Sequence, residues 1–173
     1  MIIAIDGPSA SGKSTTAKGV SNKLGFTHID TGSMYRAVTF GLNHENIMLD
    51  DRNRIISYLE NLDLKFDSSG HIVLNGENVS NAIRTVEISS KVSMISAIPE
   101  IRSKMVEFQR NIAGESDCVL EGRDIGTVVF PNADYKFYMI ADINIRAQRR
   151  LIELKKINES TTIEEIISSI KIR

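Results

Sequence analysis

The stretch Gly7-Pro8-Ser9-Ala10-Ser11-Gly12-Lys13-Ser14-Thr15 decides the fold. It follows an apolar run at residues 2–5 and precedes a segment in which Ala17, Val20 and Leu24 recur at helical spacing. The stretch therefore fits the pattern G-x-x-x-x-G-K-[ST] in the strand, loop and helix setting that this motif requires. Glycines let the backbone curl so that its N–H groups meet phosphates at the positive end of the next helix.

This pattern predicts a site for a purine nucleoside triphosphate, with residues 7–15 around its phosphates. Lys13 is expected to reach the β- and γ-phosphates, and the Ser14 hydroxyl is expected to ligate Mg²⁺. The alternative is a glycine-rich turn that binds nothing. The lysine, the hydroxyl and the preceding strand all stand in register, which favours the nucleotide site.

Composition narrows the range of partners. The chain has 173 residues, of which 42% are hydrophobic and 25% are charged, so a single domain over residues 1–173 is expected. The formal net charge is −1, from 21 Lys and Arg against 22 Asp and Glu. A chain this close to neutrality has no overall field that attracts nucleic acid or membranes. A small acidic ligand must therefore be held by individually placed arginines.

Cys118, the only cysteine, lies in an apolar run and reads as a buried core residue. The first residues lack the basic segment of a signal peptide, and no apolar run is long enough to span a membrane. We therefore expect a cytoplasmic protein, and we expect it to be a monomer.

Hydrophobic periodicity predicts strands alternating with helices, and hence a parallel sheet flanked by helices. Between residues 62 and 80 the period switches to two around turn residues, which predicts a small antiparallel β insert. We also expect Asp50 to cap a helix over 51–61, a helix to begin near Ser33, and Thr161 to open a capping box with Glu164. The other expected elements are strands at 26–30, 118–120 and 135–140 and helices from Asn81 through Ile95 and from Pro99.

Three polar turns each follow a predicted strand: residues 7–14, 30–32 and 121–124. Ligands of parallel sheets bind beyond the carboxyl ends of the strands, so these turns are expected to meet at one rim. Arg36 and Arg123 are candidate clamps for a second phosphate, because guanidinium groups match phosphate oxygens in pairs. Asp124 can accept a hydrogen bond from an exocyclic amine. The alternative for Arg123 and Asp124 is a structural ion pair within one turn.

The motifs GPSASGKST, DTGSMYRA and EGRDIGTVVFPNADYKFYM, with the β insert between the two halves, resemble bacterial-type cytidylate kinases. The resemblance runs from Ile2 to the end of the chain. It implies the P-loop nucleoside monophosphate kinase fold, with a parallel sheet in the order 2-3-1-4-5, the insert in the monophosphate-binding region and a lid at about 155–162. It also implies transfer of the γ-phosphoryl group of ATP to CMP or dCMP, with Mg²⁺.

The resemblance carries roles to individual residues. Arg36 and Arg123 match residues that hold the CMP phosphate, and Arg123 and Arg150 join Lys13 at the transferring phosphate. Arg146 would cover the adenine, although a solvated basic helix end is the alternative for Arg146 and Arg150. Glu121 would meet Mg²⁺ through water, where many members have Asp. The residues matched to the cytosine end are Thr31, Ser93, Arg102 and Asp124.

The family normally continues beyond Arg173 with another strand and helix. We therefore expect residues 1–173 to lack the C-terminal strand and helix and to leave one sheet edge open. Two enzyme classes compete with this interpretation: another small-molecule P-loop kinase, such as a shikimate- or gluconate-type kinase, and a GTPase. The sequence has no Asn-Lys-x-Asp motif for guanine, which disfavours the GTPase. A nucleotide-binding module without turnover is the third alternative.

Overall fold

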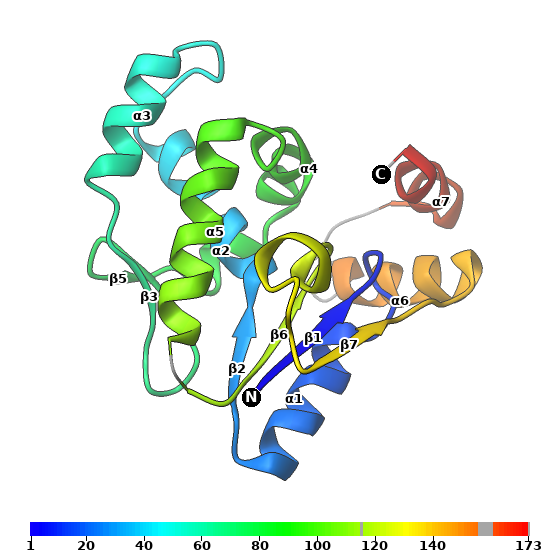
Figure 1. The fold of residues 1–173 in the computed structure, drawn as a ribbon. Coiled ribbons are helices and arrows are strands. Elements are labelled where there is room, and N and C mark those ends of the chain that lie inside the picture. The colour runs from blue at the N-terminus through cyan, green and yellow to red at the C-terminus, as the bar shows by residue number, and fades with distance from the viewer. Residues whose placement is uncertain (115, 156–160, 173) are drawn as a thin grey trace. The chain divides into compact units, whose positions relative to one another are not determined.

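The computed structural model describes residues 1–114, 116–155 and 161–172. Its internal contacts divide the chain into two compact units (Figure 1). The first comprises Met1–His28 and Ser116–Arg173, and the second comprises Ile29–Glu115. A single kinase domain over residues 1–173 stays a prediction. No helix among the described residues is both long and apolar enough to cross a bilayer.

A four-stranded sheet in the order β2-β6-β1-β7 belongs to the first unit except for the last two residues of β2. β1 pairs in parallel with both β6 and β7, and its last residue, Asp6, lies beside Gly122 of β6. In chain order the strands run 2-3-1-4, which confirms the predicted parallel sheet for the four strands present. The strand bounds are β1 (Ile2–Asp6), β2 (Thr27–Asp30), β6 (Cys118–Gly122) and β7 (Tyr135–Tyr138).

Three helices accompany this sheet: α1 (Lys13–Leu24), α6 (Ile143–Lys155) and α7 (Ile163–Ile172). α1 packs on β6 and β1, whereas α6 and α7 pack on each other (Figure 1). Ile3, Ile5, Ala17 and Val119 are buried in the core between α1 and the sheet. Cys118 is also fully buried, as its apolar surroundings in the sequence predict.

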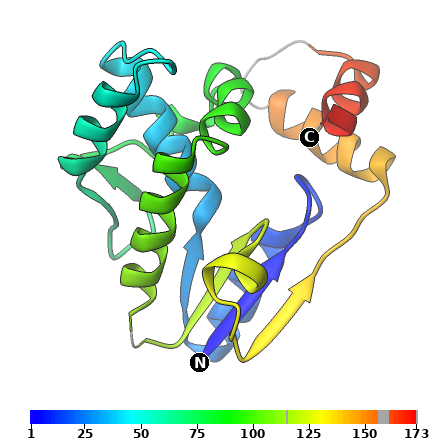
Figure 2. The same ribbon diagram turned by 45° about the horizontal axis from the view of Figure 1, so that its top comes forward.

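β7 is the outer strand of the sheet, next to β1 (Figure 2). Large side chains stand exposed along it: Tyr135 is 53%, Phe137 54% and Tyr138 68% accessible. The sequence pattern places an apolar strand here, and the structure adds that this strand buries little of its apolar surface.

The second unit is mainly helical and contains the small insert. The insert is an antiparallel sheet in the order β3-β4-β5, which confirms the β subdomain predicted between residues 62 and 80. α2 packs against α4, α5 and β4, and α3 packs against α5. The bounds are α2 (Thr31–His44), α3 (Arg52–Glu60), β3 (Leu64–Phe66), β4 (Ile72–Leu74), β5 (Glu77–Asn78), η1 (Ala82–Arg84), α4 (Val86–Ile95) and α5 (Pro99–Ala113).

Helix starts differ slightly from the sequence expectations, because the capping side chain is a neighbouring polar residue. Asp51, not Asp50, caps α3 by accepting a hydrogen bond from the Arg54 N–H group. α2 begins at Thr31 after Asp30, whose carboxylate accepts from the Ser33 N–H group at 3.2 Å. The expected helix from Asn81 to Ile95 is divided, with a 3₁₀ turn before Thr85 caps α4.

α7 begins with a capping box one residue later than expected. The Glu165 N–H group donates to Thr162 Oγ1 at 3.2 Å, and the Thr162 N–H group donates to a Glu165 carboxylate oxygen at 2.9 Å. These contacts lower the pKa of Glu165, since hydrogen bonds from the Thr162 N–H group and the Thr161 hydroxyl favour the charged carboxylate. The adjacent threonines and glutamates make both registers compatible with the sequence pattern.

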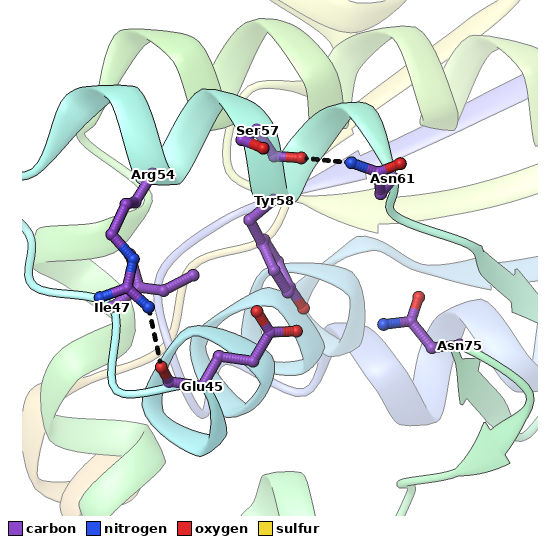
Figure 3. A pocket seen from close by; sticks show the side chains of 7 residues that line it. All are labelled: Glu45, Ile47, Arg54, Ser57, Tyr58, Asn61 and Asn75. Carbon is purple, nitrogen blue, oxygen red and sulfur yellow. Dashed lines mark hydrogen bonds between the residues drawn. The ribbon is translucent and has the colours of Figure 1, made fainter.

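A pocket of about 220 Å³ lies within the second unit, bordered by the end of α2, by α3 and by the β4–β5 turn (Figure 3). Its lining includes Glu45, Arg54, Tyr58 and Asn75. Among the described residues the buried Tyr58 hydroxyl has no hydrogen-bond partner. Burial, and then the nearby charge of Glu45, raise the pKa of Tyr58 far above its ordinary value.

Candidate active site

The predicted strand, loop and helix are all present around residues 7–15. β1 ends at Asp6 and α1 begins at Lys13. Between them Gly7 has φ 148° and Gly12 has φ 103°, a backbone conformation that favours glycine. A Cβ atom at Gly7 would lie 2.3 Å from the Met139 carbonyl oxygen, so the chain after β7 passes directly over this glycine. The glycines of the motif therefore satisfy steric requirements that another residue would violate.

Cationic side chains hold the carbonyl oxygens of this phosphate loop. Lys13 Nζ donates to Pro8 O at 2.8 Å, and Arg146 Nε donates to Ser9 O at 2.9 Å. One guanidinium nitrogen of Arg149 donates to Ala10 O at 3.2 Å and to Ser11 O at 3.0 Å. Three cations thus neutralise the electronegative edge of a loop that must receive an anion.

Arg149 belongs to none of the sequence motifs. It lies three residues after Arg146 on α6, a spacing that places both side chains on one helix face. Arg150, which the resemblance assigns to the transferring phosphate, donates to Glu153 one turn further along the helix, at 3.0 Å. The predicted lid at about 155–162 falls largely on residues 156–160, which lie outside the described residues.

Ser14, Glu121 and His28 form a hydrogen-bonded row at the base of the loop. Ser14 Oγ donates to one Glu121 oxygen at 2.6 Å, and His28 Nε2 lies 3.0 Å from the other. The Glu121 side chain is only 5% accessible and the His28 side chain is 18% accessible. The sequence analysis places Ser14 and Glu121 in one site, and the fold adds His28 to it.

The turn after β6 carries Arg123 and Asp124 and is fixed to the end of β1. Both carboxylate oxygens of the buried Asp6 accept backbone hydrogen bonds, from Ile125 and Gly126, each at 2.8 Å. A short π-helical turn, η2 (Ile125–Val129), follows directly. Asp124 is therefore the residue from which this turn begins, next to the strand that feeds the phosphate loop. Sequence reasoning missed Asp6, although an acidic residue at the end of an apolar strand is a signal of such a role.

The remaining predicted residues lie in the second unit. The Arg36 guanidinium group, on α2, donates to Ser89 Oγ at 2.7 Å and to Ile83 O at 3.4 Å. Thr31 is buried at the start of the same helix, whereas Ser93 is exposed on α4. Arg102 lies on α5, which packs against α2.

The charge of Arg102 acts on Tyr35, a residue of α2. Burial raises the pKa of Tyr35, whereas the positive charge of Arg102 and a hydrogen bond with Gln109 lower it. The outcome is a raised pKa, so desolvation exceeds the two opposing effects. Arg102 therefore lies within electrostatic reach of the helix that carries Thr31 and Arg36.

Two kinds of binding chemistry are present, one in each unit. The first unit has a glycine loop at a helix N-terminus with a lysine, a hydroxyl and a buried carboxylate, which suits a metal-bound polyphosphate. The second unit has two arginines on neighbouring helices with hydroxyl groups on the same elements, which suits a smaller anionic ligand.

Comparison with known proteins agrees with this chemistry. The family model described as Cytidylate kinase matches residues 3–173. The cytidylate kinase of Caldanaerobacter subterraneus subsp. tengcongensis is 48% identical over 171 residues, which cover 99% of this chain and 76% of the relative. That of Clostridioides difficile is 44% identical and covers 98% and 78%, and that of Chloroherpeton thalassium is 50% identical and covers 90% and 67%.

The family model extends through both units, from residue 3 to residue 173. Proteins of this family are nucleoside monophosphate kinases, with ATP as phosphoryl donor and CMP as acceptor. The phosphate loop and the buried Ser14–Glu121 contact agree with a family match that runs from residue 3 to residue 173. The chain therefore belongs to the cytidylate kinase family.

Proposed function

We propose that this chain transfers the γ-phosphoryl group of ATP to CMP or dCMP and releases ADP and the nucleoside diphosphate. The observation that carries the proposal is the phosphate loop, whose Lys13 and Ser14 open α1 while Ser14 contacts Glu121 of β6. A lysine and a hydroxyl at a helix N-terminus beside a strand-end carboxylate are what a metal-bound triphosphate requires.

On the donor side, the backbone of residues 7–15 would hold the phosphates of ATP and Lys13 would contact the β- and γ-phosphates. Arg146 would cover the adenine. Since Arg146 and Lys13 donate to loop carbonyls in this structure, both side chains already stand at the loop.

Mg²⁺ fits the oxygen donors of the same loop. Kinase sites hold Mg²⁺ through one or two protein groups, substrate phosphates and water. Ser14 Oγ and the Glu121 carboxylate lie 2.6 Å apart and are both hard oxygen donors, so Ser14 would ligate the ion and Glu121 would reach it through water. When bound, the ion neutralises charge on the β- and γ-phosphates.

On the acceptor side, Arg36 and Arg123 would hold the CMP phosphate through paired hydrogen bonds. Thr31, Ser93 and Arg102 would contact the cytosine end. Asp124 would accept from the cytosine amino group, where uracil has a carbonyl that leaves two acceptors facing each other. Recognition of this kind discriminates by several powers of ten, which is why we favour CMP over UMP.

In the transfer step, a CMP phosphate oxygen forms a bond to the γ-phosphorus as the bond from that phosphorus to the bridging oxygen of ADP breaks. The attacking oxygen is ionised at neutral pH, so the step needs no general base. Catalysis of such a transfer rests on alignment and charge neutralisation. Lys13, Arg123 and Arg150 would supply the neutralising charges, with Arg150 leaving Glu153.

A coupled assay of ADP release, with chromatography of the nucleotide product, tests the proposal directly. We expect CDP from CMP, dCDP from dCMP and at least a hundredfold lower kcat/KM with UMP. A different P-loop kinase would release ADP only with a non-nucleotide acceptor. Calorimetric ATP binding without any CDP formation would contradict the proposal and support a binding module.

Asp124 provides the specificity test. Replacement of Asp124 by Ala should lower kcat/KM for CMP by about a hundredfold, because the base amine loses its acceptor, and should change the KM for ATP by less than about threefold. The matched variant Asp124→Asn keeps an acceptor oxygen and should lose less. Equal weakening of both nucleotides in Asp124→Ala would show that Asp124 does not read the base.

We further propose that one chain is the catalytic unit, because Ser14 and Glu121 of the donor site already meet within a single chain. CMP and ATP are charged and do not cross membranes unaided, so the enzyme must share their compartment, which we propose is the cytoplasm.

We also propose that residues about 155–162 act as a lid, which would exclude water during transfer. Sedimentation of the protein with and without both nucleotides measures its mass in solution and so tests the proposal that it is a monomer.

A further inference from the structure

Glu121 is held at both of its carboxylate oxygens. One oxygen accepts from Ser14 Oγ at 2.6 Å and the other lies 3.0 Å from His28 Nε2. The three groups come from α1, β6 and β2, which are brought together only by the fold. Since a carboxylate oxygen can only accept, Nε2 of His28 carries the proton of this contact.

The contact between His28 and Glu121 is shielded from solvent, which strengthens it. The Glu121 side chain is 5% accessible and that of His28 is 18% accessible, so water competes little for either oxygen. A charge-assisted hydrogen bond in such surroundings is stronger than one at the surface. By contrast, a second histidine–carboxylate contact, His71 with Asp67 at 3.2 Å, is half exposed and joins residues four apart in a turn.

Glutamate needs such a partner more than aspartate does. Its extra methylene adds a rotatable bond, and an unrestrained Glu can lose up to about 2 kcal/mol of side-chain freedom when it is fixed. His28 on β2 binds the Glu121 oxygen that does not contact Ser14, and this second contact fixes the longer side chain in one orientation.

We propose that His28 is a positioning residue for Mg²⁺ binding, acting through Glu121. This inference rests on the proposed function, in which Glu121 meets the ion through water. Hydrogen-bond partners of metal-binding carboxylates commonly change metal affinity by about 10- to 100-fold when they are removed. In this role His28 would touch neither the nucleotide nor the ion.

Two amide variants separate this role from simple packing. The Gln side-chain nitrogen can occupy the place of His Nε2, whereas the Asn nitrogen corresponds to Nδ1 and falls short of Glu121. Calorimetry of ADP binding, once with Mg²⁺ and once with EDTA, gives the factor by which Mg²⁺ tightens ADP. We expect His28→Gln to keep this factor within about threefold, and His28→Asn to lower it by about tenfold or more.

If His28 served only to pack the fold, replacing it would change the affinity for ADP measured in EDTA. In both variants it should stay within about twofold of the parent value, since the loop itself is unchanged. A Glu121→Ala background should abolish the difference between Gln and Asn at position 28. His71→Asn, the same change at the exposed histidine–carboxylate pair, should leave the Mg²⁺ factor unaltered.

The inference is overturned if His28→Asn retains the parent Mg²⁺ factor, if it weakens ADP equally with Mg²⁺ and with EDTA, or if the two amides still differ without Glu121. Failure of the proposed function is a separate result, seen as absence of CDP formation by the parent protein with Mg·ATP and CMP. A parent that makes CDP with an unchanged His28→Asn factor refutes the role of His28 alone.

Discussion

At the scale of single residues, Gly7 shows how the phosphate loop depends on one absent side chain. Its φ of 148° is unfavourable for other residues, and the Met139 carbonyl oxygen occupies the space of a Cβ. Backbone after β7 therefore approaches the loop more closely than any substituted residue permits. The motif glycine is required by a neighbour 132 residues away as well as by phosphate.

Gly7→Ala tests this requirement. The added methyl group must displace Met139, so we expect the free energy of unfolding to fall by about 2 kcal/mol and ATP affinity to fall by at least tenfold. Chemical denaturation and calorimetry measure the two effects. Gly19→Ala is the matched control, because nothing lies within 4 Å of a Cβ there and an alanine within α1 should stabilise by up to about 1 kcal/mol. A loss of ATP affinity in Gly19→Ala as well would refute the steric explanation.

Two tyrosines of the second unit differ in hydrogen bonding. The Tyr58 hydroxyl is buried without a partner among the described residues, whereas Tyr35 has a hydrogen bond with Gln109. Tyr58→Phe should therefore raise the free energy of unfolding by about 1 kcal/mol, and Tyr35→Phe should lower it by about the same amount. Urea denaturation followed by circular dichroism measures both. Destabilisation by Tyr58→Phe would mean that its hydroxyl has a partner in solution.

At the scale of elements, α6 supports the phosphate loop from outside. Arg146 and Arg149 reach three successive loop carbonyls, at Ser9, Ala10 and Ser11. A loop whose carbonyl oxygens are held needs less ordering when a nucleotide binds, and such pre-organisation increases affinity. α6 is thereby an accessory of the loop even though more than a hundred residues separate them.

Arg149→Ala removes two of these contacts. We expect the ATP dissociation constant to rise by about tenfold, since a hydrogen bond from a charged donor contributes about 1.5 kcal/mol or more when shielded, and only one of these two is part-buried. Gln148→Ala, at the exposed neighbouring position, should leave it unchanged. Calorimetry with ATP gives both constants, and an unaltered constant for Arg149→Ala would show that the loop keeps its shape without α6.

The sequence predicts those elements whose signal is local. Periodicity indicates the alternating strands and helices and the small β insert, and the phosphate loop is a contiguous motif whose shape depends on its own glycines. Cap positions shift by a residue, as at Asp51 and Thr162, because neighbouring polar residues compete for the same backbone groups.

The missed parts of the site are all long-range. Asp6 contacts residues 119 and 120 positions away, and His28 contacts Glu121 across 93 positions. Such pairs depend on strand order and register, so a polar residue near a strand end marks a candidate position without revealing its partner. The π-helical turn at Ile125–Val129 was missed for the same reason, since the Asp6 carboxylate binds its first N–H groups.

At the scale of the whole molecule, buried titratable groups set the alkaline limit of stability. Burial raises the pKa of Cys118 to about 11 from an ordinary value of 9.0. Because the folded-state pKa is the higher one, this stabilisation is complete below about pH 9 and is lost as pH rises through about 11. Tyr35 and Tyr58 act in the same direction at higher pH.

We therefore expect the free energy of unfolding to fall by about 3 kcal/mol between pH 9 and 11 on account of Cys118. Urea denaturation across this range measures the decline. In Cys118→Ala the decline should be shallower by one titrating proton, although the variant starts from a lower stability. An identical pH slope in both proteins would mean that the thiolate is tolerated in the folded state.

The exposed outer strand has a practical consequence for work with concentrated protein. Tyr135, Phe137 and Tyr138 present rings to water along a sheet margin, and such margins recruit further strands from other molecules. Concentrated samples should thus become turbid, through side-by-side association of strands from different molecules, well before the fold itself is lost. Turbidity and loss of the fold will therefore need separate measurements.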